Sequence, residues 1–245
     1  MLAIVPARGG SRGLPGKHVR PFVGKPLIAH TLDAAHGAAE VSRTVVSTDD
    51  EEIAAVARRS GAEIPFMRPA HLASDTARTA SVCVHVLDEL ERREGLRVEE
   101  FVLLQPTSPL RTAEDIDAAI RIFRERRADS VVSVSRVPKP LFWAHAIDQD
   151  GRLREFFPHH FPEVTRWPQA DAPRQTFPEA YLPNGAVYVT RAALVRQGTF
   201  FGQRTYPSLM PLERSVDIDT LEDFEWAEWL WHRTLDAAAK EGTPG

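Results

Sequence analysis

Residues 2–18 read LAIVPARGGSRGLPGKH, a short apolar run followed at once by a loop that is rich in glycine and positive charge. The ten residues from Arg8 to Lys17 contain three cations and four glycines, namely Gly9, Gly10, Gly13 and Gly16. Backbone N–H groups can close around phosphate oxygens only where side chains do not obstruct them, and ligand sites of α/β sheets lie in the loops after strands. The stretch therefore predicts a buried strand over residues 2–7, followed by a phosphate cradle with countercharge from Arg8, Arg12 and Lys17.

Two familiar phosphate-binding loops do not fit this stretch. The P-loop pattern fails because Ser11 stands where its first glycine belongs and His18 where its hydroxyl belongs. The dinucleotide pattern fails because Arg8 occupies its first glycine position. The loop thus favours neither a P-loop NTPase nor a dinucleotide dehydrogenase, and its alternative interpretation is a solvated turn without a ligand.

The rest of the chain alternates short apolar runs with helical periodicity, which is typical of strands joined by crossover helices in a largely parallel sheet. We expect strands over residues 2–7, 43–48, 101–105, 129–135 and 184–190. We expect helices after Pro26 and over residues 48–61, 76–94, 112–127 and 221–239. The predicted fold class is therefore α/β, with a Rossmann-like, mostly parallel sheet and helices on both faces.

Capping residues mark the starts of two of these helices. The helix over 48–61 has Thr48 or Asp49 as its expected N-cap, acidic residues in its first turn and Gly61 as its stop. The helix over 112–127 has Thr112 as its expected N-cap, with Asp115 three residues later to complete a capping box. This second helix carries an apolar stripe that is expected to cover the sheet.

Residues 138–183 break this pattern with prolines, aromatic residues and charges, and the stretch is too long for an ordinary connection inside a compact domain. We expect residues 1–137 and 184–240 to form the α/β domain, with residues 241–245 as a frayed tail. The excursion over 138–183 is predicted to cover a site or to reach a partner subunit.

An acidic pair lies near the C-terminus, where Asp217 and Asp219 flank Ile218 in SVDIDT. In an extended segment both carboxylates point one way while the isoleucine faces the core. Mg²⁺ prefers oxygen ligands and commonly bridges one or two carboxylates to substrate phosphates. The pair is therefore a candidate Mg²⁺ site. The alternative is a solvated pair before the last helix, where Thr220 and Asp223 already form a cap pattern.

A second polar group, Gln105, Thr107, Ser108 and Arg111, follows the predicted strand over 101–105. These residues fall in a strand-to-helix loop at the same sheet edge as the glycine-rich loop. An amide, two hydroxyls and a guanidinium suit a polyol acid. For Arg111, pairing with the acidic first turn of its own helix is the alternative.

Charge balance and cysteine content exclude several classes of protein. The 30 basic and 34 acidic side chains leave a net charge of −4, so nothing indicates a surface for sequence-independent binding of nucleic acid. No segment approaches the roughly 20 apolar residues of a membrane span. Cys83 lies in an apolar stretch and is the single cysteine, which indicates a buried thiol in a reducing compartment. We therefore expect a cytoplasmic protein that binds neither nucleic acid nor membranes.

Six blocks of the sequence, in the expected order, resemble the CMP-sialic acid synthetases, or acylneuraminate cytidylyltransferases, over nearly the whole chain. The blocks are VPARGGSRGLPGKH (5–18), STDDEEIA (47–54), RPAHLASDTARTA (68–80), LLQPTSPLR (103–111), RQTFPEAYLPNGAVYV (174–189) and DIDTLEDF (217–224). That family joins CTP to a nine-carbon keto acid. The resemblance implies a nucleotidyltransferase fold, the release of pyrophosphate, and Mg²⁺ as the cofactor.

The resemblance also implies roles for individual residues. The nucleotide side comprises Ala7, Arg8, Gly9, Gly10, Ser11, Arg12, Lys17 and Arg68. The acceptor side comprises Gln105, Thr107, Ser108, Arg111, Lys139, Arg174, Tyr181 and Asn184. Asp217 and Asp219 are expected to hold Mg²⁺ and to act in catalysis together with Arg12 and Lys17. Arg174 and Tyr181 are expected to approach the acceptor from the neighbouring subunit of a homodimer.

One position departs from the family, which usually has asparagine where this chain has His18. An imidazole is larger than an amide and titrates near neutral pH. The shape of the cradle and the preference for a particular nucleotide or acceptor are therefore left open at this position. Relatives activate sialic, legionaminic or pseudaminic acids, and some act on phosphonates. Two other classes also stay open: a glycosyltransferase that carries an Asp-x-Asp metal pair, and a nucleotide-binding protein without catalysis.

Overall fold

The computed structural model of the chain describes residues 1–10, 13–157, 173, 175 and 177–241, with side chains as far as residue 234. The chain divides into two compact units. Met1–Val134 and Pro183–Gly245 form the first unit, and Ser135–Leu182 form the second.

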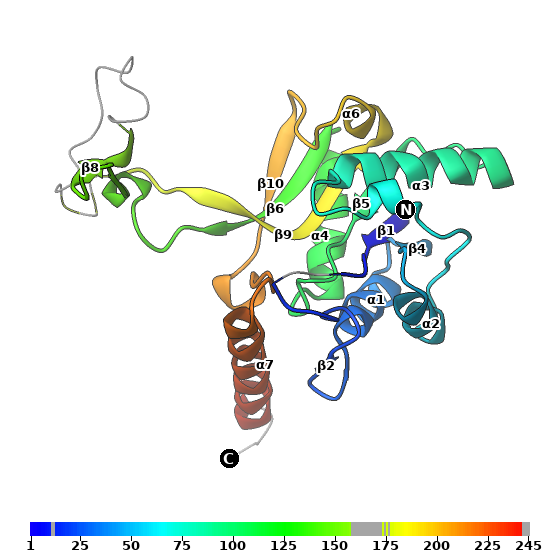
Figure 1. Ribbon diagram of the computed structural model, residues 1–245, viewed down its shortest axis with the longest axis horizontal. Coiled ribbons are helices and arrows are strands. Elements are labelled where there is room, and N and C mark those ends of the chain that lie inside the picture. The colour runs from blue at the N-terminus through cyan, green and yellow to red at the C-terminus, as the bar shows by residue number, and fades with distance from the viewer. Residues whose placement is uncertain (11–12, 158–172, 174, 176, 242–245) are drawn as a thin grey trace. The chain divides into compact units, whose positions relative to one another are not determined.

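A mixed six-stranded sheet, counted over the described residues, forms the centre of the first unit (Figure 1). Its spatial order is β10 (Thr205–Leu209), β6 (Ser130–Arg136), β9 (Tyr181–Arg191), β5 (Glu100–Leu103), β1 (Leu2–Pro6) and β4 (Arg43–Ser47). Strand β1 pairs in parallel with β4 and β5, and β10 pairs in parallel with β6, whereas β9 runs antiparallel to β5. All five predicted strands are present. Strand β10 was not predicted, because Pro207 interrupts its pattern, which an edge strand tolerates.

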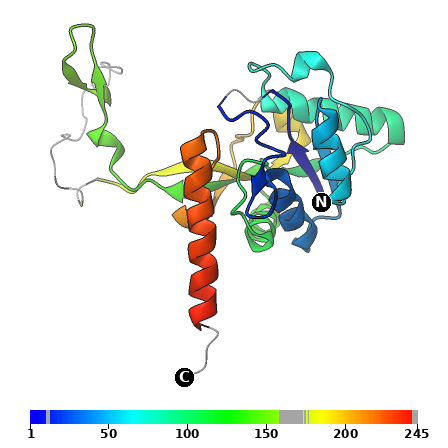
Figure 2. The same cartoon turned by 60° about the horizontal axis from the view of Figure 1, so that its bottom comes forward.

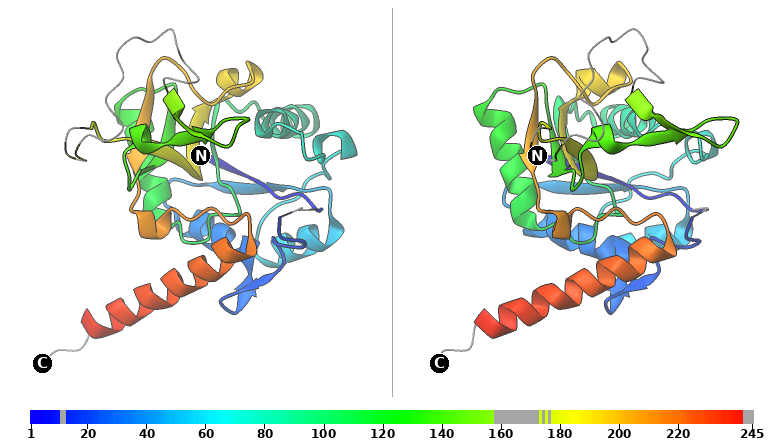
Figure 3. Two further views of the ribbon diagram at one scale, coloured as in Figure 1. Left: turned by 60° about the vertical axis from the view of Figure 1, so that its left-hand side comes forward. Right: turned by 90° about the vertical axis from the view of Figure 1, so that its left-hand side faces the viewer.

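Helices cover both faces of this sheet (Figures 1 and 3). One face packs against α1 (Leu27–Gly37), α2 (Glu51–Arg59) and α4 (Ala113–Glu125). The other packs against α3 (Thr79–Glu94) and α6 (Ala192–Arg196). The predicted α/β class with a mostly parallel sheet and helices on both faces is therefore confirmed. No described helix is long and apolar enough to cross a membrane.

The predicted N-cap is confirmed at α4 and wrong at α2. Thr112 and Asp115 form the predicted capping box at α4. At α2 the predicted N-cap was wrong, because Asp50 accepts hydrogen bonds from the backbone N–H groups of the first turn. Thr48 instead accepts from the Asp50 backbone, and Asp49 accepts a hydrogen bond from the glycine-rich loop.

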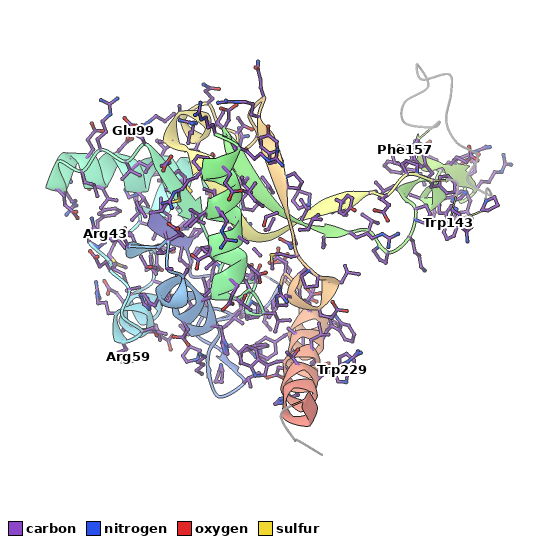
Figure 4. All side chains as sticks on the ribbon, turned by 180° about the vertical axis from the view of Figure 1, so that it is seen from behind. Arg43, Arg59, Glu99, Trp143, Phe157 and Trp229 are labelled. Atoms are coloured by element: carbon purple, nitrogen blue, oxygen red, sulfur yellow. The ribbon has the colours of Figure 1, made fainter. Side chains whose placement is uncertain are left out.

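The C-terminal helix α7 (Leu221–Glu241) joins a third apolar cluster. Its Phe224 packs edge-on against Phe22, at 5.3 Å between ring centroids, beside the short ribbon of β2 (Pro21–Phe22) and β3 (Lys25–Pro26). Ile218 is fully buried in the same cluster. Trp229, labelled in Figure 4, lies on the exposed side of α7. The burial of Ile218 fixes the segment that carries the two aspartates.

The second unit contains the short helix η2 (Leu141–Trp143) and a hairpin of β7 (His145–Ile147) and β8 (Leu153–Glu155). Its aromatic side chains gather around Phe142, which lies 5.1 Å from Phe157 and 5.6 Å from Phe177 between ring centroids. Trp143 packs edge-on against Phe177. Figure 4 labels Trp143 and Phe157 in this cluster. The hairpin exposes the apolar side chains of Ile147 and Leu153.

Candidate active site

A cavity of about 540 Å³ opens in the first unit at the edge of the sheet where β1 ends. Four segments line it. The glycine-rich loop and its start contribute Pro6, Arg8, Gly13, Lys17 and His18. The chain between β4 and α3, with the first turns of α3, contributes Arg68, Leu72, Ser74, Asp75, Ala77, Thr79 and Val82. The loop after β5 and the segment before α7 contribute Gln105, Pro106, Thr107, Asp217, Asp219 and Thr220.

The glycine-rich loop leaves β1 beside the segment that precedes α3 (Figure 2). The backbone N–H of Gly9 donates a hydrogen bond of 3.1 Å to Oδ1 of Asp49. A Cβ atom at Gly13 would lie 2.3 Å from the backbone oxygen of Asp219, so only glycine fits this contact. The loop is therefore held at its start by the end of β4 and at its centre by the acidic segment. Ser11 and Arg12 lie outside the described residues.

Lys17 connects the loop to the acidic pair from a buried position. Its Nζ donates hydrogen bonds of 2.8 Å to the backbone oxygen of Ile218 and to Oδ1 of Asp219. Arg8, at the loop's start, forms an ion pair of 2.7 Å with Asp75. Both cations therefore line the cavity and bind carboxylates at its edge.

The acidic pair has the alternating burial expected of an extended segment. Ile218 is fully buried, Asp217 is half-buried and Asp219 is exposed. Oδ1 of Asp217 is buried and has no hydrogen-bond partner among the described residues. Burial raises the pKa of the Asp217 carboxyl, and the negative charge of Asp219 adds to the shift, while Thr107 and Lys17 oppose it. The carboxylate therefore lacks a counter-ion of sufficient charge.

These two carboxylates fit a hard divalent cation. A cation would give the orphaned Oδ1 of Asp217 a partner and would relieve the repulsion between the two aspartates. Within the described part of the chain, no group of three or more His, Cys, Asp or Glu side chains is arranged to hold a metal ion. An ion at Asp217 and Asp219 would therefore complete its coordination with water and substrate oxygens, as Mg²⁺ commonly does.

Arg68 is a buried cation on another side of the cavity, with 5% of its surface exposed. Its Nε donates a hydrogen bond of 3.1 Å to Oγ of Ser47, and its guanidinium also binds the Ser47 backbone oxygen. Burial lowers its pKa to about 10, and Asp49 opposes this shift. The guanidinium therefore stays charged at neutral pH and places a positive charge in the cavity near the end of β4.

His18 is buried beside these cations, with 6% of its surface exposed. Its Nδ1 has no hydrogen-bond partner among the described residues. Burial lowers the pKa of the imidazole to about 3, and the positive charges of Lys17 and Arg68 add to the effect. The expected titration near neutral pH is therefore wrong for His18, which is a neutral side chain in the cavity wall.

The loop after β5 divides between the cavity and the protein interior. Gln105 and Thr107 line the cavity, whereas Ser108 and Arg111 are buried and do not line it. The guanidinium of Arg111 donates hydrogen bonds of 3.1 Å to the backbone oxygen of Gln105 and 2.7 Å to that of Ala186. Burial lowers its pKa to about 9. Arg111 therefore ties the end of β5 to β9.

Asn184 is likewise buried among strands. Its Oδ1 accepts hydrogen bonds of 2.6 Å from Oγ of Ser133 and 3.1 Å from the backbone N–H of Ala186. Its Nδ2 donates a bond of 2.9 Å to Oγ of Ser215. Asn184 thus links β6, β9 and the segment before the acidic pair.

Residues 2–241 match the sequence profile of a family described as Cytidylyltransferase. The chain belongs to this family. It is 35% identical over 239 residues to CMP-N,N'-diacetyllegionaminic acid synthase of Legionella pneumophila, covering 97% of this chain and 98% of the relative. It is 28% identical to pseudaminic acid cytidylyltransferase of Campylobacter jejuni, over 97% of this chain and 98% of that protein.

Two further comparisons agree with this assignment. The N-acylneuraminate cytidylyltransferase of Streptococcus agalactiae is 34% identical over 98% of this chain, which spans 55% of that longer protein. A solved structure of CMP:2-keto-3-deoxy-manno-octonic acid synthetase complexed with CTP superposes with a TM-score of 0.64. It is 16% identical and covers 95% of this chain and 98% of its own, which supports the fold. The chain is thus a nucleotidyltransferase of the acylneuraminate cytidylyltransferase type.

The remaining candidate residues of this cytidylyltransferase lie in the second unit. Lys139 is exposed there, and the hydroxyl of Tyr181 donates a hydrogen bond of 2.8 Å to Oε2 of Glu179. Arg174 lies outside the described residues. Contact of these side chains with an acceptor stays a prediction.

Sequence reasoning missed one side of the cytidylyltransferase cavity. Within RPAHLASDTARTA only Arg68 was singled out, yet Ser74, Asp75 and Thr79 also line the cavity. The signal was a run of short polar residues directly before a helix at the ligand-binding edge of the sheet. Their side chains are too small and common to indicate a ligand by type alone.

Proposed function

We propose that this chain transfers the cytidylyl group of CTP to an acidic keto-deoxy sugar of the sialic, legionaminic or pseudaminic type. The observation that carries the proposal is one cavity with Arg8, Lys17 and Arg68 as cations and Asp217 with Asp219 as a paired acid. Cations suit a triphosphate, and the acidic pair suits the Mg²⁺ that accompanies it. Membership of the cytidylyltransferase family supports cytidine as the nucleoside.

The reaction is an in-line displacement at the α-phosphorus of CTP. The anomeric hydroxyl of the sugar attacks the α-phosphorus and loses its proton, while the bond to the β-phosphate breaks and pyrophosphate leaves. Negative charge on the phosphates is the barrier, so positioning and electrostatic stabilisation supply most of the catalysis. Lys17 and Arg12 bind the triphosphate in this proposal, with Arg8 and the backbone of Ala7, Gly9, Gly10 and Ser11 around it.

Asp217 and Asp219 are the proposed ligands of Mg²⁺, which when bound neutralises phosphate charge and orients the triphosphate. Lys17 bonds Asp219 and thereby holds that carboxylate beside the cradle. The close contact between Gly13 and the Asp219 backbone fixes the distance between the loop and the acidic pair. Triphosphate and metal are thus bound by two segments that are packed directly on one another.

Acceptor recognition is proposed for Gln105 and Thr107, which line the cavity next to Asp217. Ser108, Arg111 and Asn184 remain predicted acceptor residues. The hydrogen bonds of the Arg111 and Asn184 side chains also support the backbone around Gln105 and Ala186. Lys139, Arg174 and Tyr181 are proposed to reach the acceptor from a second protomer of a homodimer.

The exposed apolar side chains of the β7–β8 hairpin support this homodimer, because surfaces of this kind mark association sites. The proposed compartment is the cytoplasm. Cys83 is fully buried, and burial raises the pKa of its thiol to about 12, which is consistent with a structural thiol that needs no oxidising environment.

The deciding experiment is pyrophosphate release by the purified chain with Mg²⁺ and each of the four nucleoside triphosphates. Acceptors would include sialic, legionaminic and pseudaminic acids, keto-deoxyoctonate and small phosphonates. Release with CTP and a nine-carbon acid is expected. Release only with a phosphonate would keep cytidylyl transfer and overturn the acceptor class. Binding of CTP without release from any acceptor would contradict the proposed transfer.

A further inference from the structure

Three carboxylates bind the donors of the glycine-rich loop. Asp49 accepts from the Gly9 backbone at 3.1 Å, Asp75 pairs with Arg8 at 2.7 Å, and Asp219 pairs with Lys17 at 2.8 Å. A backbone N–H, a guanidinium and an ammonium are also the groups that bind phosphate oxygens in such loops. The carboxylates therefore occupy donors that a nucleotide would need.

Asp75 differs from the other two carboxylates in its surroundings. Asp49 fixes the backbone at the start of the loop, and Asp219 belongs to the proposed metal pair. Asp75 belongs to the segment before α3, lines the same cavity as Arg8, and has no part in the proposed chemistry. The side chains of Arg8 and Asp75 are 30% and 31% exposed. Water screens a pair of this exposure, so its exchange for another anion is inexpensive.

We propose that Asp75 is a positioning residue that holds Arg8 at the rim of the cavity and is exchanged for a nucleotide phosphate. Binding of the triphosphate breaks the Arg8–Asp75 pair and brings phosphate charge close to the Asp75 carboxylate. Both effects oppose binding, so Asp75 weakens nucleotide affinity. The same carboxylate recaptures Arg8 when pyrophosphate leaves, which favours product release. This inference rests on the proposed function, because it requires a phosphate ligand in this cavity.

The test is calorimetric titration of CTP, and separately of inorganic pyrophosphate, into the full chain with Mg²⁺. D75N removes the charge and keeps the shape, D75S is a second neutral variant, and D75E retains the charge. D75N and D75S are expected to bind CTP about two- to fivefold more tightly at low salt, as follows from the usual strength of exposed ion pairs. D75E is expected to stay within about twofold of the wild type.

Salt dependence separates this role from a structural one. The advantage of D75N is expected to disappear between about 0.02 and about 0.5 M salt, since the Debye length falls below the distance between neighbouring groups. A packing change would persist at high salt. The matched control is D88N, because Asp88 forms an ion pair of the same 2.7 Å length with Arg196 and does not line the cavity. D88N is expected to leave the CTP affinity unchanged.

The outcomes are distinct for the two proposals. Equal or weaker CTP binding by both D75N and D75S, with a wild type that binds CTP, would overturn the role of Asp75 alone. Weaker binding would indicate that the pair pre-organises Arg8 for the nucleotide, and equal binding would show that the pair has no effect on affinity. A wild type that binds neither CTP nor pyrophosphate would overturn the proposed function and, with it, the exchange at Arg8.

Discussion

The rim of the cavity and the protein interior beside it use positive charge in different ways. At the rim, Arg8 binds the carboxylate of Asp75. Lys17 reaches the rim from a buried position and binds the carboxylate of Asp219 as well as the Ile218 backbone oxygen, and both carboxylates are accessible to water. In the interior, Arg111 is 3% exposed and binds the backbone oxygens of Gln105 and Ala186. A carboxylate partner can be exchanged for a phosphate, whereas two backbone oxygens of adjacent strands stay where the sheet holds them. The difference predicts that rim charges control binding and turnover, and that Arg111 controls stability.

The largest expected effect concerns Lys17. The K17Q variant is expected to lower kcat/KM for CTP by about 10²–10³, because one charged donor to the transition state is lost. The stability of the variant should change far less. K25Q is the matched control, since Lys25 pairs with Asp33 at an exposed site that does not line the cavity. Near-full turnover of K17Q would break the assignment of the rim to phosphate binding.

Replacement of Arg111 tests the other half of the comparison. R111M is expected to lower the free energy of unfolding by about 1–3 kcal/mol, because two carbonyl groups beside the sheet lose their buried donor. Urea denaturation measures this loss, with the exposed R196Q as a control that should unfold like the wild type. An R111M variant with unchanged stability and a raised KM for the acceptor would show that Arg111 acts on the ligand instead.

Replacement of Asp217 by asparagine is expected to raise stability at neutral pH and to remove the stabilising effect of Mg²⁺. Its carboxyl has a raised pKa, so the folded state binds protons more tightly than the unfolded state, and stability falls as pH rises above the ordinary carboxyl range. D217N should therefore have a higher Tm than the wild type at neutral pH, where each 1 kcal/mol corresponds to about 2–4 °C in a chain of this size.

Thermal unfolding with and without Mg²⁺ measures this effect. The advantage of D217N should vanish below about pH 4, where the wild-type carboxyl is protonated in both states. Mg²⁺ should raise the Tm of the wild type and not that of D217N. A D217N variant that is less stable at neutral pH would contradict a carboxylate whose burial disfavours its charged form.

The smallest expected effect belongs to His18. Its pKa of about 3 keeps the imidazole neutral, so the affinity for CTP should show no inflection from this residue between about pH 5.5 and about pH 8. H18N and the wild type should therefore have parallel pH profiles, measured by titration of CTP. An inflection near pH 6.5 in the wild type that is absent in H18N would place a charged imidazole at the rim.

Local patterns in the sequence were sufficient for most of the fold. The apolar runs at 43–48 and 101–105 became β4 and β5, and Thr112 with Asp115 capped α4, since these features depend on neighbours within a few residues. The N-cap prediction for α2 was wrong because it depended on a distant part of the chain. Asp49 has the right side chain for a cap, but the Gly9 backbone, forty positions away, takes its carboxylate.

Some residues of the candidate site could likewise be predicted from local patterns, and others could not. Glycines and cations after a strand, and two aspartates around an isoleucine, indicated the ends of the cavity, because each pattern is local and its chemistry is narrow. Asp75, a common polar residue in an irregular segment, gave no such indication. Arg111 and Asn184 were of the right type for an acceptor, yet their partners lie on strands that only folding brings near.

The sequence by itself determined the α/β class, the position of the glycine-rich loop at the cavity and that of the acidic pair. Periodicity, glycine content and residue spacing are properties of short segments, and they set local geometry directly. The tertiary structure decided which charges can exchange partners. Burial of Ile218 aims the aspartates, the Gly13 contact sets the loop against them, and the sheet encloses Arg111. The whole fold sets how far a charged side chain is exposed to water and how strongly it interacts with its partners, so no short segment contains that information.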